Sequence, residues 1–455
     1  MYLFVVTLIL LVSPQFHNTR NFFRALGFAP TPLAMKFSFN KGVERHWDNS
    51  SDGPLLERMR SNTMRFGILL KIMHYLAPLF TFIPISLLIK LAGFSHHFHE
   101  LIIIPLTALF MGTGNRTSSV SASIVGQSFT NPLASLFQYD SKRVVANQPE
   151  MAAFPCLHSV YQSAKVQVES SSDHATVHLN RPVKRVFRYD DHVIIVDTSG
   201  RAVRFDDVIL ACSPEVSLRI LHHPSIVERI ALGNVAFYDD VTVTHQDEPY
   251  MRQLYDVDHK RADQYYIYSY EDDPEHIEMS FNLSNYQSQL QQLKPSTSSS
   301  KPVSVSHASG PSLLDVWQSI YLNQSLASRR WTIDRLESKR IVATKWWRQM
   351  AHRWQHFSLT VPLVHQLHSR RRHTLYAGSW MLVNMHEVAV LSGLSAAYEL
   401  GADYPFPQDK KATGSFYAFL LIAHGTVPRQ WRATVRTIIY SLLTIILAII
   451  LYQWM

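Results

Sequence analysis

Glycine and cysteine are both scarce in this chain. Only 16 of its 455 residues are glycine, which is about half of the usual share of roughly 7%. The two cysteines, Cys156 and Cys212, lie in apolar contexts and have no closely spaced partner. The sequence therefore excludes a disulfide framework and a cysteine-based metal module. No H-E-x-x-H pattern occurs, and residues 96–100 (HHFHE) are too tightly spaced for a common metal site, so we expect no metal and interpret this stretch as a polar turn.

The positive charge of the chain is a modest excess that is not concentrated in one nucleic-acid-binding motif. Lys and Arg number 43 against 35 Asp and Glu, which gives a net charge of +8. We find no nucleic-acid-binding motif, so we expect no nucleic-acid partner and attribute the excess to a membrane surface or to solubility. The run 370–372 (RRR) precedes an apolar strand and is interpreted as a solvated turn.

Only one apolar run is long enough to cross a bilayer. Residues 437–454 contain no charge, and eighteen helical residues just span a hydrocarbon core of about 30 Å. Arg429, Arg432 and Arg436 lie on the N-terminal side only. The positive-inside rule then predicts a tail anchor with the bulk of the protein facing the cytosol. A buried core helix is the alternative, and the organelle stays open.

Two other apolar stretches are interpreted differently. Residues 1–17 lack the basic start of a signal peptide. Residues 66–93 contain Pro78 and Pro84, which predict several helices broken at proline rather than one span. An interfacial position is left open for this stretch, with Lys71 and Lys90 extending toward lipid head groups.

The rest of the chain alternates between helical and strand-rich patterns. Residues 18–165 are expected to be mainly helical. Period-two or β-branched patterns predict strands at 174–179, 183–187, 193–197, 203–205, 207–212, 235–238, 241–244, 264–268 and 278–281. The strand at 207–212 has the continuous apolar pattern of a fully buried strand. Residues 287–312 are rich in Ser, Gln, Pro and Lys, which predicts a disordered surface loop.

The clearest sequence pattern lies near the C-terminus and predicts a strand, a turn and a helix. Residues 373–378 form an apolar strand that ends at Gly378, and a helix with a stripe of small side chains follows at 387–400 before Gly401. The N-terminus of such a helix directs backbone N–H groups and the positive end of its dipole toward the end of the strand. A pyrophosphate is a natural ligand for this arrangement.

Several strings together resemble a known flavoprotein family. They are NTRNFFRALG at 18–27, YDDVTVTH at 238–245, IEMSFNL at 277–283, KWWRQMAHRW at 345–354, YAGSW at 376–380 and NMHE at 384–387. Segments 174–215 and 373–406 resemble the flavin-proximal pieces of the FAD-binding domain in amine-oxidase-like flavoproteins. Residues 18–406 as a whole resemble the predicted NAD/FAD-binding oxidoreductases that are often encoded beside cyclopropane-fatty-acid synthases.

The resemblance implies a fold and its division into domains. The fold would be α/β: a discontinuous, Rossmann-like FAD-binding domain that lacks its first βαβ unit, with an inserted α+β substrate domain and a C-terminal transmembrane helix. The implied parts are an apolar N-terminal segment (1–17), a mainly helical part of the substrate domain (18–165), FAD-domain strands (166–221), the substrate-domain sheet and helices (222–365), the FAD-domain C-terminal strand and helix (366–406), an amphipathic linker (407–436) and the transmembrane helix (437–454).

The resemblance also assigns residues to the cofactor. It implies that Val183 lies near the adenine, that Ala211 lies beside FAD, and that Gly378, Ser379 and Trp380 flank the ribityl chain and pyrophosphate. The backbone amides at His386, Glu387 and Val388 would cap the phosphates. Ser379 replaces the aspartate that is common in the wider family.

One family element is missing. The family begins with a strand and a G-x-G-x-x-G turn, whereas the nearest glycine pair here, in residues 112–115 (GTGN), lacks the third glycine. We therefore expect a truncated or misassembled gene.

Catalytic residues are harder to assign, because flavin chemistry resides in the cofactor ring. Candidates are His386 and Glu387 at the turn, and Lys345, which belongs to a helix-spaced aromatic stripe with Trp346, Trp347 and Trp354. That stripe fits a pocket lining or a core.

Three functions are compatible with the sequence. The first is FAD-dependent oxidation or desaturation of an apolar, lipid-derived small molecule at a membrane. The second is a catalytically inactive, membrane-tethered scaffold or gene fragment, which the missing glycine turn would favour. The third is a true amine oxidase, which needs an amine pocket that the sequence does not reveal.

Overall fold

The computed structural model describes residues 11–431, except 112–115, 132–135, 147–149, 155–156, 259–262, 287–314 and 324–329. The chain divides into two compact units, each made of separate segments. The first unit comprises Met1–Asn180 and Asn234–Leu359, and the second comprises Arg181–Gly233 and Thr360–Met455. The predicted loop 287–312, the glycine pair in 112–115 and the predicted span 437–454 lie outside the described residues. Within the described ranges, no helix is both long and apolar enough to cross a membrane.

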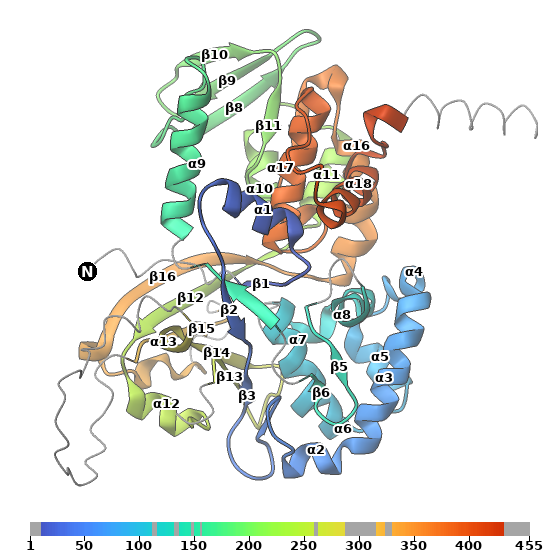
Figure 1. Ribbon diagram of the computed structural model, residues 1–455, viewed down its shortest axis with the longest axis vertical. Helices are drawn as coiled ribbons and strands as arrows, with labels where there is room; N and C mark the ends of the chain where they lie inside the picture. The colour runs from blue at the N-terminus through green and yellow to red at the C-terminus, as the bar shows by residue number, and fades with distance from the viewer. Residues whose placement is uncertain are drawn as a thin grey trace, which may run out of the picture. The chain divides into compact units, whose positions relative to one another are not determined.

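A seven-stranded sheet forms the centre of the first unit (Figure 1), with the strand order β16-β12-β15-β14-β13-β3-β4. Only β3 and β13 pair in parallel; the other neighbours are antiparallel. The strands are β3 (Phe37–Phe39), β4 (Trp47–Asp48), β12 (Phe237–His245), β13 (Tyr265–Ser269), β14 (Ile277–Asn282), β15 (Trp317–Tyr321) and β16 (Ile341–Met350). Large aromatic side chains fill the core of the unit, including the fully buried Trp47, Trp317 and Tyr266. The structure confirms the predicted antiparallel sheet and adds β3, which is contributed by a stretch expected to be mainly helical.

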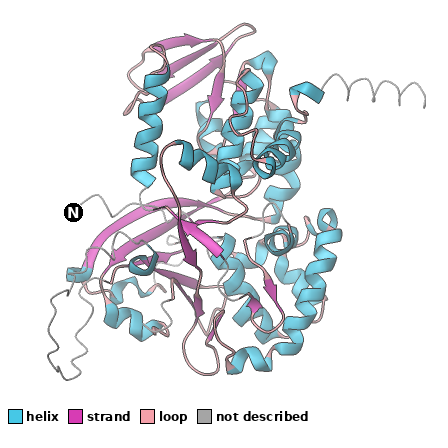
Figure 2. Cartoon of the chain, in the orientation of Figure 1, coloured by secondary structure: helices cyan, strands magenta, loops and turns pink. Residues whose placement is uncertain are grey.

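Helices make up much of the rest of the first unit, and Figure 2 shows them in cyan. They are α1 (His17–Ala25), α2 (Pro54–Arg58), α3 (Arg60–Tyr75), α4 (Ala77–Phe80), α5 (Ile85–Leu91), α6 (His96–Phe98), α7 (Ile104–Met111), α8 (Ala122–Thr130), α9 (Leu157–Ser171), α12 (Glu248–Leu254) and α13 (Leu283–Tyr286). Small sheets are formed by β1 (Leu11–Val12), β7 (Glu150–Ala153) and β2 (Thr31–Ala34), and by β5 (Tyr139–Asp140) and β6 (Val144–Val145). The predicted breaks are confirmed: Pro78 opens α4 and Pro84 precedes α5, where a missing N–H costs nothing.

The second unit contains two small sheets and five helices of four or more residues in its described part. Strands β8 (Val183–Arg188), β9 (Val193–Asp197) and β10 (Ala202–Phe205) form an antiparallel sheet, and β11 (Val208–Leu210) pairs in parallel with β17 (Thr374–Tyr376). The helices are α10 (Pro214–Ile220), α11 (Ile226–Gly233), α16 (Val364–Leu367), α17 (His386–Leu400) and α18 (Lys410–His424). The predicted strands of this unit and the 387–400 helix are confirmed, and Gly401 ends that helix with a left-handed φ of 118°.

Three local predictions are wrong. Residues 174–179 form no strand, since no neighbouring strand pairs with them. The aromatic stripe at Lys345, Trp346 and Trp347 lies on strand β16, because pairing with β12 over nine residue pairs overrides the helical spacing. Residues 96–100 are helical instead of forming a polar turn. They make up α6 and the start of a π-helix at His99–Ile103, and His96 Nδ1 lies 2.9 Å from Glu100 Oε2.

Candidate cofactor site

Most of the predicted cofactor residues of the second unit follow the two strands of its parallel pair, whereas Val183 lies on β8. In β11 and β17, Leu210 lies opposite Tyr376, and the backbone N–H of Ala377 donates to the carbonyl of Leu210 at 3.0 Å. Parallel strands release their following loops at the same edge. Ala211 and Gly378, which are far apart in the sequence, therefore leave the sheet side by side.

Gly378 adopts a backbone conformation that other residues rarely take. Its φ is 153°, and an added Cβ would lie 2.5 Å from the indole of Trp380. Its N–H donates to Ser392 Oγ at 2.8 Å, which ties the turn to α17. The hydroxyl of the next residue, Ser379, donates to Asn384 Oδ1 at 2.8 Å. The turn is thus fixed at both ends, and it leaves backbone rather than side chain facing outward at residue 378.

Helix α17 begins at His386, directly after this turn. Its N-cap residue Met385 has extended backbone and provides no side-chain cap. Burial lowers the pKa of His386 to about 4, so its imidazole is neutral near pH 7. Glu387 and Val388 follow in the first turn and are both buried. The helix end therefore combines a positive dipole end with an uncharged imidazole.

A cavity of about 710 Å³ opens on the other side of β11, between β8 and α10. Val183 and Ala211 both line it, as do Ile209 and Cys212. Ile209 is 37% exposed, so the prediction of a fully buried strand is wrong at this position. Alternate side chains of a strand point to opposite faces. All three residues of β11 line the cavity, but Val208 and Leu210 are buried whereas Ile209 is exposed.

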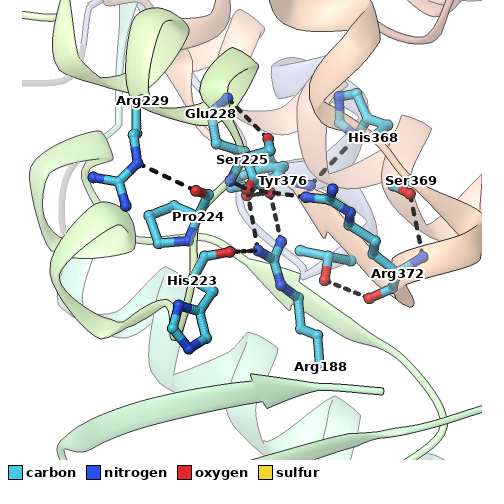
Figure 3. Close-up of polar contacts among 11 residues, drawn as sticks. Arg188, His223, Pro224, Ser225, Glu228, Arg229, His368, Ser369, Arg372 and Tyr376 are labelled. Atoms are coloured by element: carbon cyan, nitrogen blue, oxygen red, sulfur yellow. Dashed lines mark hydrogen bonds and ion pairs between the residues drawn. The ribbon is translucent and has the colours of Figure 1, made fainter. Parts of the chain in front are cut away.

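A buried ion pair, absent from the sequence-based predictions, fixes the position of β17 (Figure 3). Glu228 of α11 accepts two hydrogen bonds from Arg188 of β8, at 2.5 and 3.1 Å, and one from the hydroxyl of Tyr376 at 2.7 Å. The N–H of Ser225 completes the set at 2.6 Å. Burial raises the pKa of Glu228, but the bonds from Arg188, Ser225 and Tyr376 outweigh it and hold the pKa at about 2. The carboxylate therefore stays ionised and links β8, α11 and β17.

No local sequence signal could have identified this network. Arg188 and Glu228 are 40 positions apart, and Glu228 and Tyr376 are 148 apart. Ser392 could have been suspected only from its place on the small-residue side of α17. Such long-range polar contacts become visible when the strands are paired.

The third catalytic candidate, Lys345, lies in the first unit. It is opposite Thr242 on β16, and its side chain is exposed. Of its aromatic neighbours, Trp346 is 55% exposed, while Trp347 donates to Thr242 Oγ1 at 2.8 Å. Val183, Ala211, Gly378, Ser379, Trp380, His386, Glu387 and Val388 all belong to the second unit.

The residues of the second unit fit the FAD that the resemblance implies. Trp380 is 4% exposed, and its indole N–H has no hydrogen-bond partner among the described residues. A buried donor without a partner is costly, and a ligand acceptor would satisfy it. The bare backbone at Gly378 permits the close approach that a dinucleotide needs. The apolar wall at Val183 and Ile209 suits a flat ring.

Comparison with known proteins leads to the same family. The family model of flavin-containing amine oxidoreductases matches residues 157–238. Similar folds occur in a CLA-producing fatty acid isomerase from P. acnes (TM-score 0.55, 11% identity), in wild-type putrescine oxidase bound to putrescine (0.55, 11%) and in cyclohexylamine oxidase from Brevibacterium oxydans (0.52, 12%). Each alignment covers 86% of this chain and 86% of the other. No curated protein matches the sequence.

The family match and the local geometry concern the same part of the chain. The matched residues include β8, β9, β10, β11 and α10, which supply the cavity and the strand that pairs with β17. Residues 157–238 therefore match the flavin-containing amine oxidoreductase family, and the chain as a whole shares its fold with the isomerase and the two oxidases.

Proposed function

We propose that this oxidoreductase oxidises or desaturates an apolar, lipid-derived substrate at a membrane. Residues 437–454 would tether it there, with the bulk of the chain in the cytosol. The observation that carries the proposal is the imidazole of His386 at the carboxyl edge of β17, which burial keeps neutral.

The similarity to a fatty acid isomerase supports an apolar substrate, although at 11% identity it concerns the fold alone. The sequence resemblance to oxidoreductases encoded beside cyclopropane-fatty-acid synthases points the same way. Putrescine oxidase and cyclohexylamine oxidase share the fold to a similar extent. Direct substrate tests must therefore separate a lipid from an amine.

Bound FAD supplies the electron-accepting ring. In this proposal, Gly378 and the first turn of α17 hold the pyrophosphate, and the buried indole N–H of Trp380 donates to the cofactor. His386 lies at the start of α17, and its lowered pKa keeps it unprotonated near pH 7. Glu228 acts at a distance, since it holds β17 and thereby the position of Gly378.

The first experiment is the visible absorbance spectrum of the chain purified in detergent. We expect the bands of oxidised flavin, and we expect Gly378→Val to lose them because a side chain clashes with Trp380. Gly393→Ala is the matched control, since a Cβ at Gly393 in α17 meets no atom within 4 Å. A chain without flavin in both forms would favour the inactive scaffold.

The second experiment separates the substrate classes. A long-chain unsaturated fatty acid, putrescine and cyclohexylamine are each added without oxygen to the flavin-loaded chain. Bleaching by the fatty acid, or conversion of it seen by mass spectrometry, supports the proposal. Bleaching by an amine alone would establish an amine oxidase instead.

A further inference from the structure

An apolar surface is exposed on three consecutive helices of the first unit. Ile68 and Ile72 of α3 are 61% and 44% exposed, and Tyr75 at its end is 80% exposed. The surface continues through α4 and α5, and its full membership is Met64, Ile68, Ile72, Tyr75, Leu76, Leu79, Phe82, Leu87 and Leu91. Single exposed apolar side chains are ordinary, whereas a contiguous group marks an interaction site. We refer to these nine residues as the apolar face.

The apolar face is one surface because the helices fold back on each other. In Figure 1, α3 and α5 lie next to one another, with α4 at the turn between them. Arg65 of α3 donates to the carbonyls of Ala92 and Gly93, at 2.7 and 3.2 Å, which fixes the end of α5 beside α3. The opposite side of α3 is already buried, through residues that include Phe66 and Leu70. A helix that is apolar on both sides and covered on only one can bury its exposed side against a second partner.

The stretch of sequence that carries the apolar face has charges of one sign only. Residues 58–99 contain no Asp or Glu, while their cations are Arg58, Arg60, Arg65, Lys71 and Lys90. Lys71 and Lys90 are exposed on the same helices as the apolar face. Protein interfaces are depleted in lysine. Apolar helices bordered by lysine and arginine, with exposed aromatic side chains, are instead typical of helices that lie in the surface of an anionic bilayer.

We propose that the apolar face docks the first unit onto an anionic lipid bilayer. Leu79, Phe82 and their neighbours enter the boundary between head groups and acyl chains. The alkyl stems of Lys71 and Lys90 lie along the apolar surface and their ammonium groups contact lipid phosphates. This inference deepens the proposed membrane location and rests on it, but it concerns a surface separate from the candidate cofactor site and from residues 437–454.

The test places a photo-crosslinker on the full chain. Benzoylphenylalanine replaces Phe82, and in a control it replaces Val43, which is 71% exposed elsewhere in the same unit. Each protein is reconstituted in vesicles of phosphatidylcholine with phosphatidylserine and irradiated. We expect lipid adducts at position 82 and not at 43. The yield should fall about tenfold or more in the double variant K71Q/K90Q, because each lysine near an anionic surface contributes about 1 kcal/mol.

Other outcomes would overturn the docking proposal. A crosslink from position 82 to a second copy of the chain would make the apolar face a dimer interface. An absence of lipid adducts, in protein whose flavin spectrum is intact, would leave the surface facing water. Washing at high pH separates the two membrane contacts, since it releases a chain held only by the apolar face and retains one with a spanning helix. Loss of flavin with lipid adducts intact would refute the enzymatic proposal alone.

Discussion

Two buried carboxyl groups, only twelve positions apart, have opposite ionisation. Glu228 of the second unit is 3% exposed and its pKa is held at about 2 by Arg188, Ser225 and Tyr376. Asp240 of the first unit is fully buried, and burial raises its pKa to about 7. Its Oδ1 accepts the N–H of Asn323 at 2.7 Å, but its Oδ2 has no partner among the described residues.

The difference shows that burial alone does not decide charge. Desolvation acts against both carboxylates, and only Glu228 has a bidentate cation to compensate. Glu228 consequently acts as a fixed link between strands of the cofactor unit. Asp240 is instead a titratable group inside the sheet of the first unit.

The largest expected loss of stability comes from removing Glu228, which links β8, α11 and β17. Glu228→Ala leaves Arg188 buried without its counter-charge, and this should cost about 3–5 kcal/mol. Hydrogen exchange of peptides that contain β8 and β17 measures the loss unit by unit. We expect their protection to collapse, and flavin retention with it, while β13 and β14 of the first unit are unaffected.

The matched control removes the whole network. In the triple variant R188M/E228L/Y376F no buried charge is left unpaired, so most of the lost stability should return. Equal losses in the single and triple variants would mean that packing around Glu228, rather than its charge, positions β17.

The next effect is the pH dependence caused by Asp240. Because its pKa is about 7 in the folded chain and 3.8 ordinarily, the folded state binds a proton that the unfolded state releases between these values. Stability should therefore fall as pH rises from about 4 to 7, by up to about 4 kcal/mol, and then level off. Asp240→Asn should abolish this slope in hydrogen exchange of β12. A slope unchanged in the variant would assign it to another group.

Local patterns predicted much of the cofactor unit. The strands from Val183 to Leu210 and the helix before Gly401 have periodicities and end signals that neighbouring residues determine. The wrong predictions concern residues whose structure depends on contacts with distant parts of the chain. Lys345 lies on a strand because β12 pairs with it, and Ile209 is exposed because its side chain lines the cavity beside β8 and α10. Neither carboxyl group was singled out, since only their surroundings distinguish them.

Glu228 should have the opposite effect to Asp240: it should make the folded chain less stable as the pH falls. Its pKa is depressed from 4.5 to about 2, so the stabilisation is complete above pH 4.5 and is lost as pH falls toward 2. The loss should reach about 3 kcal/mol. Hydrogen exchange of β17 at low pH, compared with the variant E228Q, measures it. An acid transition of equal depth in E228Q would show that other carboxylates dominate.

The smallest effect concerns the tyrosine that joins the link to the cofactor edge. Tyr376→Phe removes one hydrogen bond to Glu228 but leaves the ion pair with Arg188, and the net loss should be about 1–2 kcal/mol. Since Tyr376 stands two residues before Gly378, the strand end should loosen more than β8 does. We therefore expect faster flavin release, measured by fluorescence, with little change in exchange at β8. Equal loosening of both strands would mean that Tyr376 supports the ion pair as a whole, and that the cofactor edge depends on Ser392 instead.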